Sequence, residues 1–336
     1  MKTELILNKL MNKQDLTAGQ AGSFLSEVME GNVSCLQIGA VLAALRIKGE
    51  SVEEITGFVK AMRANMVNVK VGDAIDVCGT GGDGIGTFNI STAVSFVVAG
   101  AGVKVAKHGN RAASSICGSA DVLEELGVNI NLSARQAQDV FKKTGFVFLF
   151  APLFHPTMKA VGQVRKELKI RTIFNYLGPF ANPANVKKQL IGVPNKEIAK
   201  KLCDVGKKLS YEHLVIVTSI DGLDEASIFS KTIMYDIKKN KVKKIIVDPE
   251  KFGFGALKKD VLGGSAKQNA QILKEILEGV KNPKRDIVVF NSAFALYAAD
   301  VCLTIKEGIK IAQDSIDSGR AKKVLENLVK ETQKYA

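Results

Sequence analysis

The stretch GTGGDGIGTFNIST, residues 79–92, combines five glycines with a single carboxylate, that of Asp83, and leads into a helix-like run that opens near Ser91. Glycines allow backbone N–H groups to approach a ligand closely, and the N-terminus of a helix adds unpaired N–H donors and a favourable dipole. A phosphate or diphosphate group suits such a loop. Because a bare carboxylate would repel phosphate oxygens, we expect Asp83 to face a sugar hydroxyl, a water or a metal ion.

Two nucleotide-binding motifs almost match this loop. The G-x-G-x-x-G pattern of dinucleotide-binding proteins starts at Gly79, but it requires an acidic residue about 20 positions later for the ribose hydroxyls. No Asp or Glu occurs between Gly84 and Ala120. The nucleoside-triphosphate loop requires Lys and then Ser or Thr after its last glycine, whereas Ile85 and Gly86 follow here. Another phosphorylated ligand is therefore favoured.

A second anion-binding stretch, KHGNRAASSICGS, occupies residues 107–119. Lys107, Asn110 and Arg111 offer charged and amide donors, and serine hydroxyls and backbone N–H groups follow before the helix-like segment ADVLEELG. The alternative is a merely polar connection between a strand and a helix. The density of cations and hydroxyls favours an anion site.

Two adjacent carboxylates, Asp224 and Glu225, follow the strand-like run HLVIVTS within the sequence DGLDEAS. Such a pair suits Mg²⁺, which typically takes one or two carboxylates together with the phosphates of its substrate. Taken alone, the pair would be better explained as a solvated acidic turn.

Composition narrows the classes of partner. The 336 residues carry 47 Lys and Arg against 34 Asp and Glu, a net charge of +13, which favours anionic ligands in general. The basic run KKNKVKK, residues 238–244, is typical of a solvated hairpin turn, because a nucleic-acid patch would need interleaved aromatic side chains. No apolar run approaches the roughly 20 residues that span a bilayer. We therefore expect a cytoplasmic protein that binds small molecules and neither nucleic acid nor a membrane, with its scattered cysteines reduced.

The first seventy residues predict a helical unit. Capping boxes start at Thr17, Ser34 and Ser51, each followed three residues later by Gln or Glu, and Gly31 and Gly49 stand where helices should end. The apolar positions of SCLQIGAVLAALRIKG cover too much of the helix circumference for packing on one side only. A subunit contact and the inside of a small bundle would both account for this pattern.

From about residue 73, short apolar runs alternate with amphipathic segments. The runs AIDVCG, VKVAKHG, FVFLFAP, KQLIGVP and HLVIVTS are strand candidates, and this alternation is typical of a parallel sheet covered by helices. We expect an α/β fold with a small all-helical N-terminal domain over residues 1–70, on which helices from about 155–185 are candidates to pack. A large domain with a mainly parallel central sheet would span 71–336. Loops at the carboxyl ends of its strands form the candidate site.

Taken together, these stretches resemble the anthranilate phosphoribosyltransferases of tryptophan biosynthesis. The likeness rests on GTGGD at Gly79, NIST at Asn89, KHGNR at Lys107, GSAD with VLEELG at Gly118, and DGLDE at Asp221. The segments FAPLFHPTMKAVGQVRKEL and RTIFNYLGPFANP extend it over nearly the whole chain. The resemblance implies transfer of a phosphoribosyl group from phosphoribosyl pyrophosphate to the amine of anthranilate, with release of pyrophosphate, and a homodimer joined through the N-terminal helices.

The resemblance also implies site residues. The donor, phosphoribosyl pyrophosphate, would be bound by Gly79, Gly82, Asp83, Thr87, Asn89, Ile90, Ser91, Thr92, Lys107, His108, Gly109, Asn110, Arg111, Ala112, Ala113, Ser114, Ser115 and Ser119. Mg²⁺ would be coordinated by Ser91, Asp224 and Glu225. Anthranilate would be lined by Gly79, Asn110, His155, Arg165 and Gly178.

Arg165 can grip a carboxylate with two parallel hydrogen bonds, although a surface charge on an amphipathic helix is the simpler interpretation. Pyrimidine nucleoside phosphorylases, which share the fold and a loop like KHGNR, are the nearest rival. They displace a base with phosphate, and that reaction would not call for Asp83 or for the acidic pair after DGL.

Overall fold

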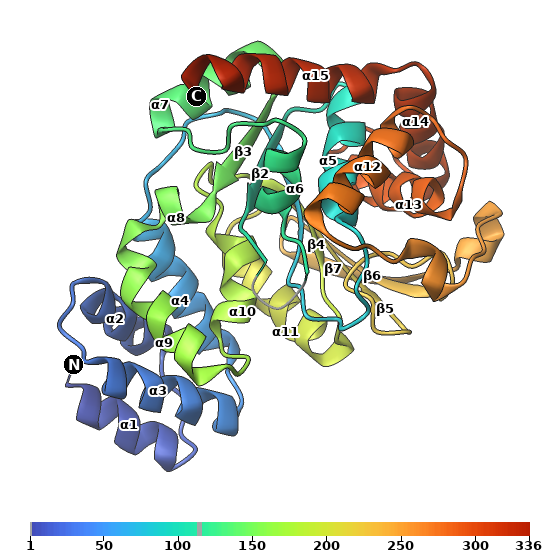
Figure 1. The fold of residues 1–336 in the computed structure, drawn as a ribbon. Coiled ribbons are helices and arrows are strands. Elements are labelled where there is room, and N and C mark those ends of the chain that lie inside the picture. Colours follow the sequence, from blue (N-terminus) through green and yellow to red (C-terminus); the bar gives the residue numbers. More distant parts are fainter. Residues whose placement is uncertain (1, 113–115) are drawn as a thin grey trace.

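The computed structural model describes residues 2–112 and 116–336. Its N-terminal part is a bundle of α1 (Thr3–Met11), α2 (Ala18–Met29), α3 (Cys35–Lys48) and α4 (Val52–Ala64), shown in blue in Figure 1. The predicted capping boxes are confirmed, because the hydroxyls of Thr17, Ser34 and Ser51 each accept the backbone N–H three residues later. Gly49, with φ 87°, ends α3 as predicted.

The chain then alternates strands and helices. The strands are β1 (Ile75–Gly79), β2 (Val105–Gly109), β3 (Phe146–Phe150), β4 (Lys188–Gly192), β5 (His213–Ser219), β6 (Thr232–Lys238) and β7 (Lys241–Val247). The helices between and after them are α5 (Ile90–Gly100), α6 (Ser119–Glu125), α7 (Ala134–Thr144), α8 (Ala151–Phe154), α9 (Lys159–Leu168), α10 (Phe174–Leu177), α11 (Lys196–Lys207), α12 (Ala266–Leu277), α13 (Pro283–Ala298), α14 (Ile305–Asp317) and α15 (Arg320–Thr332). Short 3₁₀ turns cover Pro156–Met158, Gly178–Ala181, Pro249–Phe252, Lys258–Val261 and Gln333–Tyr335.

The central sheet has the strand order β3-β2-β1-β4-β5-β6-β7. Neighbouring strands from β3 to β5 are parallel, and β6 and β7 extend the sheet as an antiparallel hairpin. The mainly parallel sheet predicted from the sequence is confirmed. The predicted turn at 238–244 was too long, because Lys239 and Asn240 alone turn the chain, with φ 48° and 61°, and β7 begins at Lys241. Two consecutive residues with positive φ are what a tight hairpin turn requires.

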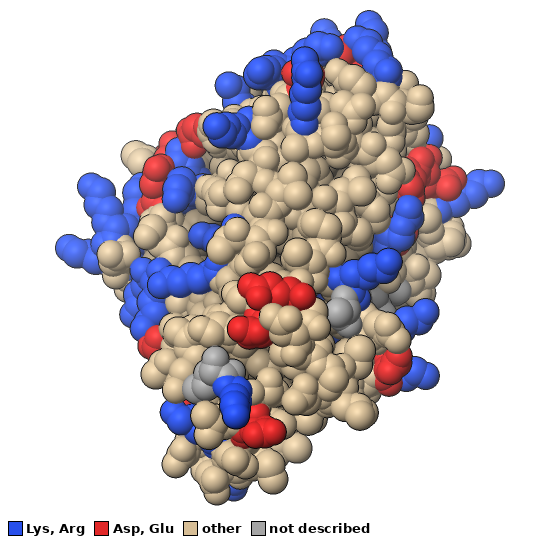
Figure 2. All heavy atoms as spheres, turned by 90° about the vertical axis from the view of Figure 1, so that its left-hand side faces the viewer, with Lys and Arg blue, Asp and Glu red and all other residues tan. Residues whose placement is uncertain are grey.

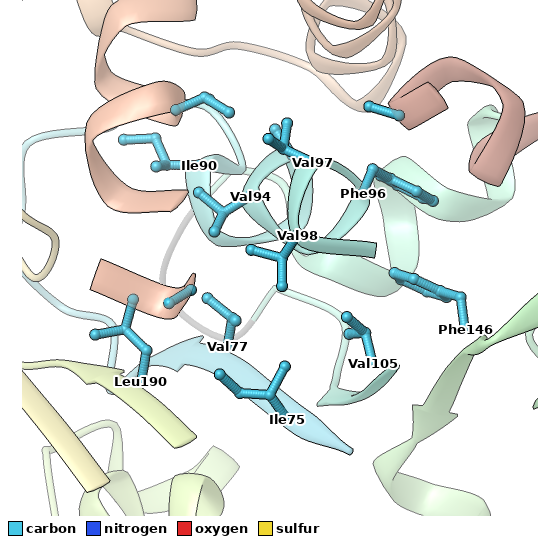
Figure 3. Close-up of a cluster of buried hydrophobic side chains, with 14 of the residues drawn as sticks. Ile75, Val77, Ile90, Val94, Phe96, Val97, Val98, Val105, Phe146 and Leu190 are labelled. Carbon is cyan, nitrogen blue, oxygen red and sulfur yellow. The ribbon is translucent and has the colours of Figure 1, made fainter. Parts of the chain in front are cut away.

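Helices cover both faces of the sheet because successive strand residues point to opposite sides. In β5, Val215 and Val217 join the hydrophobic cluster that contains α5 and α13, whereas Leu214 and Ile216 join the cluster that contains α11. In Figure 3, Val94 and Val98 of α5 lie over the strand residues of the first cluster. Phe96 of α5 stacks on Phe146 of β3 with ring centroids 4.8 Å apart.

The second cluster joins the helical bundle to the sheet. It contains Leu42 of α3, Phe58 of α4 and Val164 of α9 together with Leu202 of α11 and Ile216 of β5. The bundle and the sheet therefore share a continuous apolar core, and α9 and α10 lie against the bundle beside the carboxyl edge of the sheet (Figure 1).

Candidate active site

A cleft of about 710 Å³ opens at the carboxyl edge of the sheet. Its walls come from the loops that follow β1, β2 and β5, as expected for ligand binding in an open parallel sheet. Asp83, Lys107 and Glu225, which lie far apart in the sequence, all line this one cleft. The three stretches singled out in the sequence therefore form one site.

Most of the predicted donor residues line the cleft: Gly79, Gly82, Asp83, Thr87, Asn89, Ile90, Ser91, Thr92, Lys107, His108, Gly109, Asn110, Arg111 and Ser119. Ala112 is not among the lining residues, and its backbone N–H donates to Asp121 Oδ2 at 3.0 Å. Ala113, Ser114 and Ser115 lie outside the described residues.

Backbone conformation and two contacts determine the shape of the glycine loop. Gly81, Gly82 and Gly84 have φ of 70°, 80° and 71°, a region that residues with a Cβ atom rarely adopt. The backbone N–H of Ile85 donates to Asp83 Oδ1 at 3.0 Å, so one carboxylate oxygen of Asp83 stabilises the turn within the loop. At its far end, Thr87 forms a β-bridge with Leu262, which ties the loop to the segment before α12.

The acidic pair is buried, with exposed fractions of 9% for Asp224 and 6% for Glu225. Burial and the nearby Asp83 carboxylate raise the pKa of Asp224 to about 7. The pKa of Glu225 is also raised, by burial and then by Asp224, while Lys107 opposes this shift. Crowded, desolvated carboxyl groups of this kind favour a bound cation.

An orphaned atom indicates that a divalent cation would fit here. Asp83 Oδ2 is buried and has no hydrogen-bond partner among the described residues. Ser91, Asp224 and Glu225 line the same cleft and would supply hard oxygen ligands. Within residues 2–112 and 116–336, no three His, Cys, Asp or Glu side chains form a cage by themselves. Such an open set suits Mg²⁺, which completes its shell with oxygens of the ligand and water.

Lys107 stands at the floor of the cleft with an exposed fraction of 2%. Its Nζ donates to the Val77 carbonyl at 2.5 Å and to Ser91 Oγ at 3.3 Å. Burial lowers the pKa of Lys107, and the charges of Asp76 and Glu225 oppose that shift. The ammonium group thus lies between β1 and the start of α5, where it can meet an anion bound by the glycine loop.

Two histidines lie side by side, His108 in the wall of the cleft and His155 behind it. The rings of His108 and His155 have centroids 5.2 Å apart, and burial, followed by His155, lowers the pKa of His108 to about 3. His108 Nδ1 lies 3.3 Å from the Gly178 carbonyl, which can only accept, so we assign the proton to Nδ1. His108 Nε2 is then a lone-pair acceptor, and it is buried without a partner in the described structure.

The predicted anthranilate residues divide into two groups. Gly79 and Asn110 line the cleft, whereas His155, Arg165 and Gly178 are not among its lining residues. His155 and Gly178 reach it through contacts with His108. Arg165 projects from α9 over the ring of Phe174, 5.7 Å from its centroid, and burial lowers the pKa of its guanidinium.

Residues that the sequence analysis did not single out also shape the cleft. Arg171 lines it, and its Nη2 donates to the Gly81 carbonyl at 3.1 Å. Asn269 of α12 donates to Asn89 Oδ1 at 2.9 Å and thereby fixes the residue that precedes α5. Arg171 is the first residue of the segment RTIFNYLGPFANP, which contributed to the family resemblance, but no local pattern indicated that its side chain contacts the glycine loop. Asn269 lies 180 residues from its partner and gave no sequence signal.

Charged side chains are distributed unevenly over the surface. Figure 2 shows Lys and Arg gathered mostly toward the margins of one face, with acidic groups between them and a broad area without charge above. Inside the cleft, Arg111 is bound to Asp121 at 3.0 Å and to Glu124 at 2.5 Å.

Among the described residues, no helix is both long and apolar enough to cross a membrane.

The fold and the site define a glycosyl transferase. The helical bundle domain of the glycosyl transferase family matches residues 5–66, and its a/b domain matches residues 71–322. An anthranilate phosphoribosyltransferase of Thermoanaerobacter sp. is 49% identical over 318 residues, which cover 94% of this chain and 94% of that protein.

Two solved structures are similar over almost their entire length. The crystal structure of anthranilate phosphoribosyltransferase from Thermus thermophilus superposes with a TM-score of 0.92 at 34% identity, covering 98% of this chain and 99% of that one. The enzyme from Saccharomyces cerevisiae in complex with PRPP and Mg gives a TM-score of 0.90 at 29% identity, covering 99% and 98%. The chain belongs to the anthranilate phosphoribosyltransferase family and is a pentosyltransferase.

Proposed function

We propose that the protein transfers the phosphoribosyl group of phosphoribosyl pyrophosphate to the amine of anthranilate, giving N-(5-phosphoribosyl)anthranilate and pyrophosphate in tryptophan biosynthesis. The observation that carries this proposal is the convergence of the glycine loop, Lys107 and the Asp224–Glu225 pair on one cleft. The cleft thus combines anion donors with an acidic cation site, as the donor substrate requires.

Backbone and side-chain donors bind the two phosphorylated arms of the donor. The N–H groups of the glycine loop, the N-terminus of α5 and Lys107 suit a diphosphate, and the stretch that follows Lys107 suits a second phosphate. Asp224, Glu225 and Ser91 would hold Mg²⁺, which when bound neutralises charge on the diphosphate. The yeast relative was solved in complex with PRPP and Mg, which supports a site that binds this donor together with Mg²⁺.

The reaction makes modest demands on acid–base chemistry. The amine lone pair of anthranilate forms a bond to the ribose anomeric carbon, the bond from that carbon to the diphosphate breaks, and the electron pair leaves with pyrophosphate. The amine then loses a proton to water or to the released pyrophosphate. Lys107 and the loop N–H groups stabilise the departing negative charge. We propose that His108 Nε2, neutral and unpartnered among the described residues, accepts a hydrogen bond from the amine.

The acceptor side rests on fewer contacts. Asn110 and Gly79 line the cleft, and Arg165 would pair with the anthranilate carboxylate after a movement of α9 toward the cleft. We propose that residues 1–70 together with helices from 155–185 move against the rest of the large domain to close the site, as lids do in many enzymes.

We further propose a cytoplasmic homodimer joined through the N-terminal helices. Apolar side chains on α1 and α3 are solvent-exposed in the single chain, with exposed fractions of 74% for Met11, 88% for Leu36 and 84% for Ile47. These exposed apolar side chains lie on two helices that contact each other, which supports an interface on this side of the bundle.

Loss of anthranilate fluorescence tests the reaction directly. Purified protein should consume anthranilate only when phosphoribosyl pyrophosphate and Mg²⁺ are both present, and pyrophosphate should appear in equal amount. Phosphorolysis of thymidine or uridine, without consumption of anthranilate, would instead support the nucleoside phosphorylase alternative.

A further inference from the structure

Two strong cations of the cleft, Lys107 and Arg171, have no carboxylate oxygen within 4.0 Å among the described residues, and of these two only Arg171 is partly exposed. Lys107 lies among buried carboxylates, and Arg111 is tied to Asp121 and Glu124. Arg171 has no carboxylate oxygen within 4.0 Å in residues 2–112 and 116–336, although it lines the cleft. Its charge is therefore available to an anionic ligand.

Arg171 reaches the glycine loop from the opposite wall. It stands between α9 and α10, on the side of the helical bundle, and its Nη2 donates to the Gly81 carbonyl at 3.1 Å. The guanidinium rests against Gly82, where a Cβ atom would overlap Arg171 Nη1. Glycine is therefore favoured at position 82 for two reasons. It adopts a φ of 80° without strain, and its lack of a Cβ atom leaves the space that the arginine occupies.

A guanidinium has five N–H donors, and the Gly81 carbonyl uses one of them. The contact orients the planar group at the rim of the loop, which reduces the entropic cost of placing it on a ligand. Arginine in this state is well suited to paired hydrogen bonds with phosphate oxygens.

We propose that Arg171 is a binding residue for the diphosphate arm of the donor, and that it joins the helical side of the cleft to the glycine loop when the donor is bound. The inference rests on the proposed function, because it assigns the diphosphate arm to the loop that Arg171 contacts. Arg171 acts by direct contact with the anion, in addition to the loop N–H groups and Lys107.

The test compares wild-type protein with Arg171→Gln, Arg171→Lys and the control Arg135→Gln. The control makes the same change of charge at a position on α7, away from the cleft. We expect Arg171→Gln to raise KM for phosphoribosyl pyrophosphate about tenfold or more and to leave KM for anthranilate within about twofold. Arg171→Lys should fall between, because it keeps the charge and loses the paired geometry.

Calorimetric titration with inorganic pyrophosphate at fixed Mg²⁺ keeps this test separate from turnover. Arg171→Gln should bind pyrophosphate about tenfold more weakly than wild type and the control. If all variants bind it equally, Arg171 only packs the loop and the proposal is wrong. Wild-type protein that binds pyrophosphate but does not consume anthranilate would overturn the proposed function and leave the Arg171 comparison valid. Thermal unfolding of each variant shows whether a loss of pyrophosphate affinity is due to misfolding. If Arg171→Gln is misfolded, the pyrophosphate affinity of Arg171→Lys decides the outcome.

Discussion

The backbone N–H of Gly81 donates a 2.7 Å hydrogen bond to Asp224 Oδ2, across a separation of 143 residues. Gly79 also lies against Asp224, since a Cβ atom at Gly79 would stand 2.5 Å from that oxygen. The anion-binding loop and the acidic pair are therefore one structural unit. A change at Asp224 should alter both the cation site and the shape of the loop.

Two substitutions at Asp224 separate these roles. Asp224→Asn keeps an oxygen that can accept from Gly81, whereas Asp224→Ala removes it. We expect both to reduce kcat/KM about a hundredfold and to raise the Mg²⁺ concentration needed for half-maximal rate, because both remove the charge. Only the alanine variant should also unfold at a clearly lower temperature. An asparagine variant with wild-type dependence on Mg²⁺ would exclude Asp224 as a ligand.

The proposed dimer face can be tested with a matched pair of substitutions. Leu36 and Leu303 are almost equally exposed, at 88% and 86%, but only Leu36 lies on the N-terminal helices. Leu36→Lys should weaken self-association about tenfold or more, because it places a charge within an apolar contact. Leu303→Lys should not. Sedimentation velocity measures both, and equal behaviour of the two variants would contradict the proposed face.

Local signals in the sequence were sufficient for most of the fold. Capping boxes at Thr17, Ser34 and Ser51 act within four residues, and the alternation of apolar runs with amphipathic segments follows from burial on both faces of a parallel sheet. The cleft residues of the first two loops could be predicted because strands of a parallel sheet end at one edge.

Contacts between distant segments were beyond such reasoning. Arg171 meets Gly81 across 90 residues, and Asn269 meets Asn89 across 180, in directions that no periodicity encodes. The proton position on His108 depends on the Gly178 carbonyl, which only the folded chain brings near. The same holds for the shared apolar core that joins the bundle to the α11 face of the sheet.

The buried histidines predict acid-dependent stability. Burial lowers the pKa of His108 to about 3 and also lowers that of His155, whereas an unfolded histidine titrates near 6.5. Below pH 6.5 these two histidines therefore bind more protons in the unfolded chain than in the folded one, so their contribution to the free energy of unfolding falls as the pH falls. Asp224, whose pKa is raised to about 7, contributes with the opposite sign. From pH 8 to pH 5, His108 should account for a loss of about 2 kcal/mol.

Urea unfolding of His108→Gln at both pH values measures this contribution. Glutamine does not titrate, so the variant should lose less stability than wild type between pH 8 and pH 5. The other titrating groups are common to both proteins and largely cancel in the comparison. An identical pH dependence in the two proteins would show that His108 is protonated in the folded state as readily as in the unfolded chain.

Substitution of two helical glycines by alanine should change the free energy of unfolding in opposite directions, because only one of them lies in a close contact between helices. Gly57 of α4 lies against α2, where an added Cβ atom would overlap the Ala18 carbonyl, whereas Gly162 on α9 has no atom within 4 Å of such a position. Gly57→Ala should therefore destabilise the protein by about 1–3 kcal/mol, since backbone must move to admit the methyl group. Gly162→Ala should stabilise it by about 0.5–1 kcal/mol through helix propensity alone. Chemical denaturation at neutral pH measures both changes, and a neutral Gly57→Ala would mean that α2 and α4 are not packed this closely.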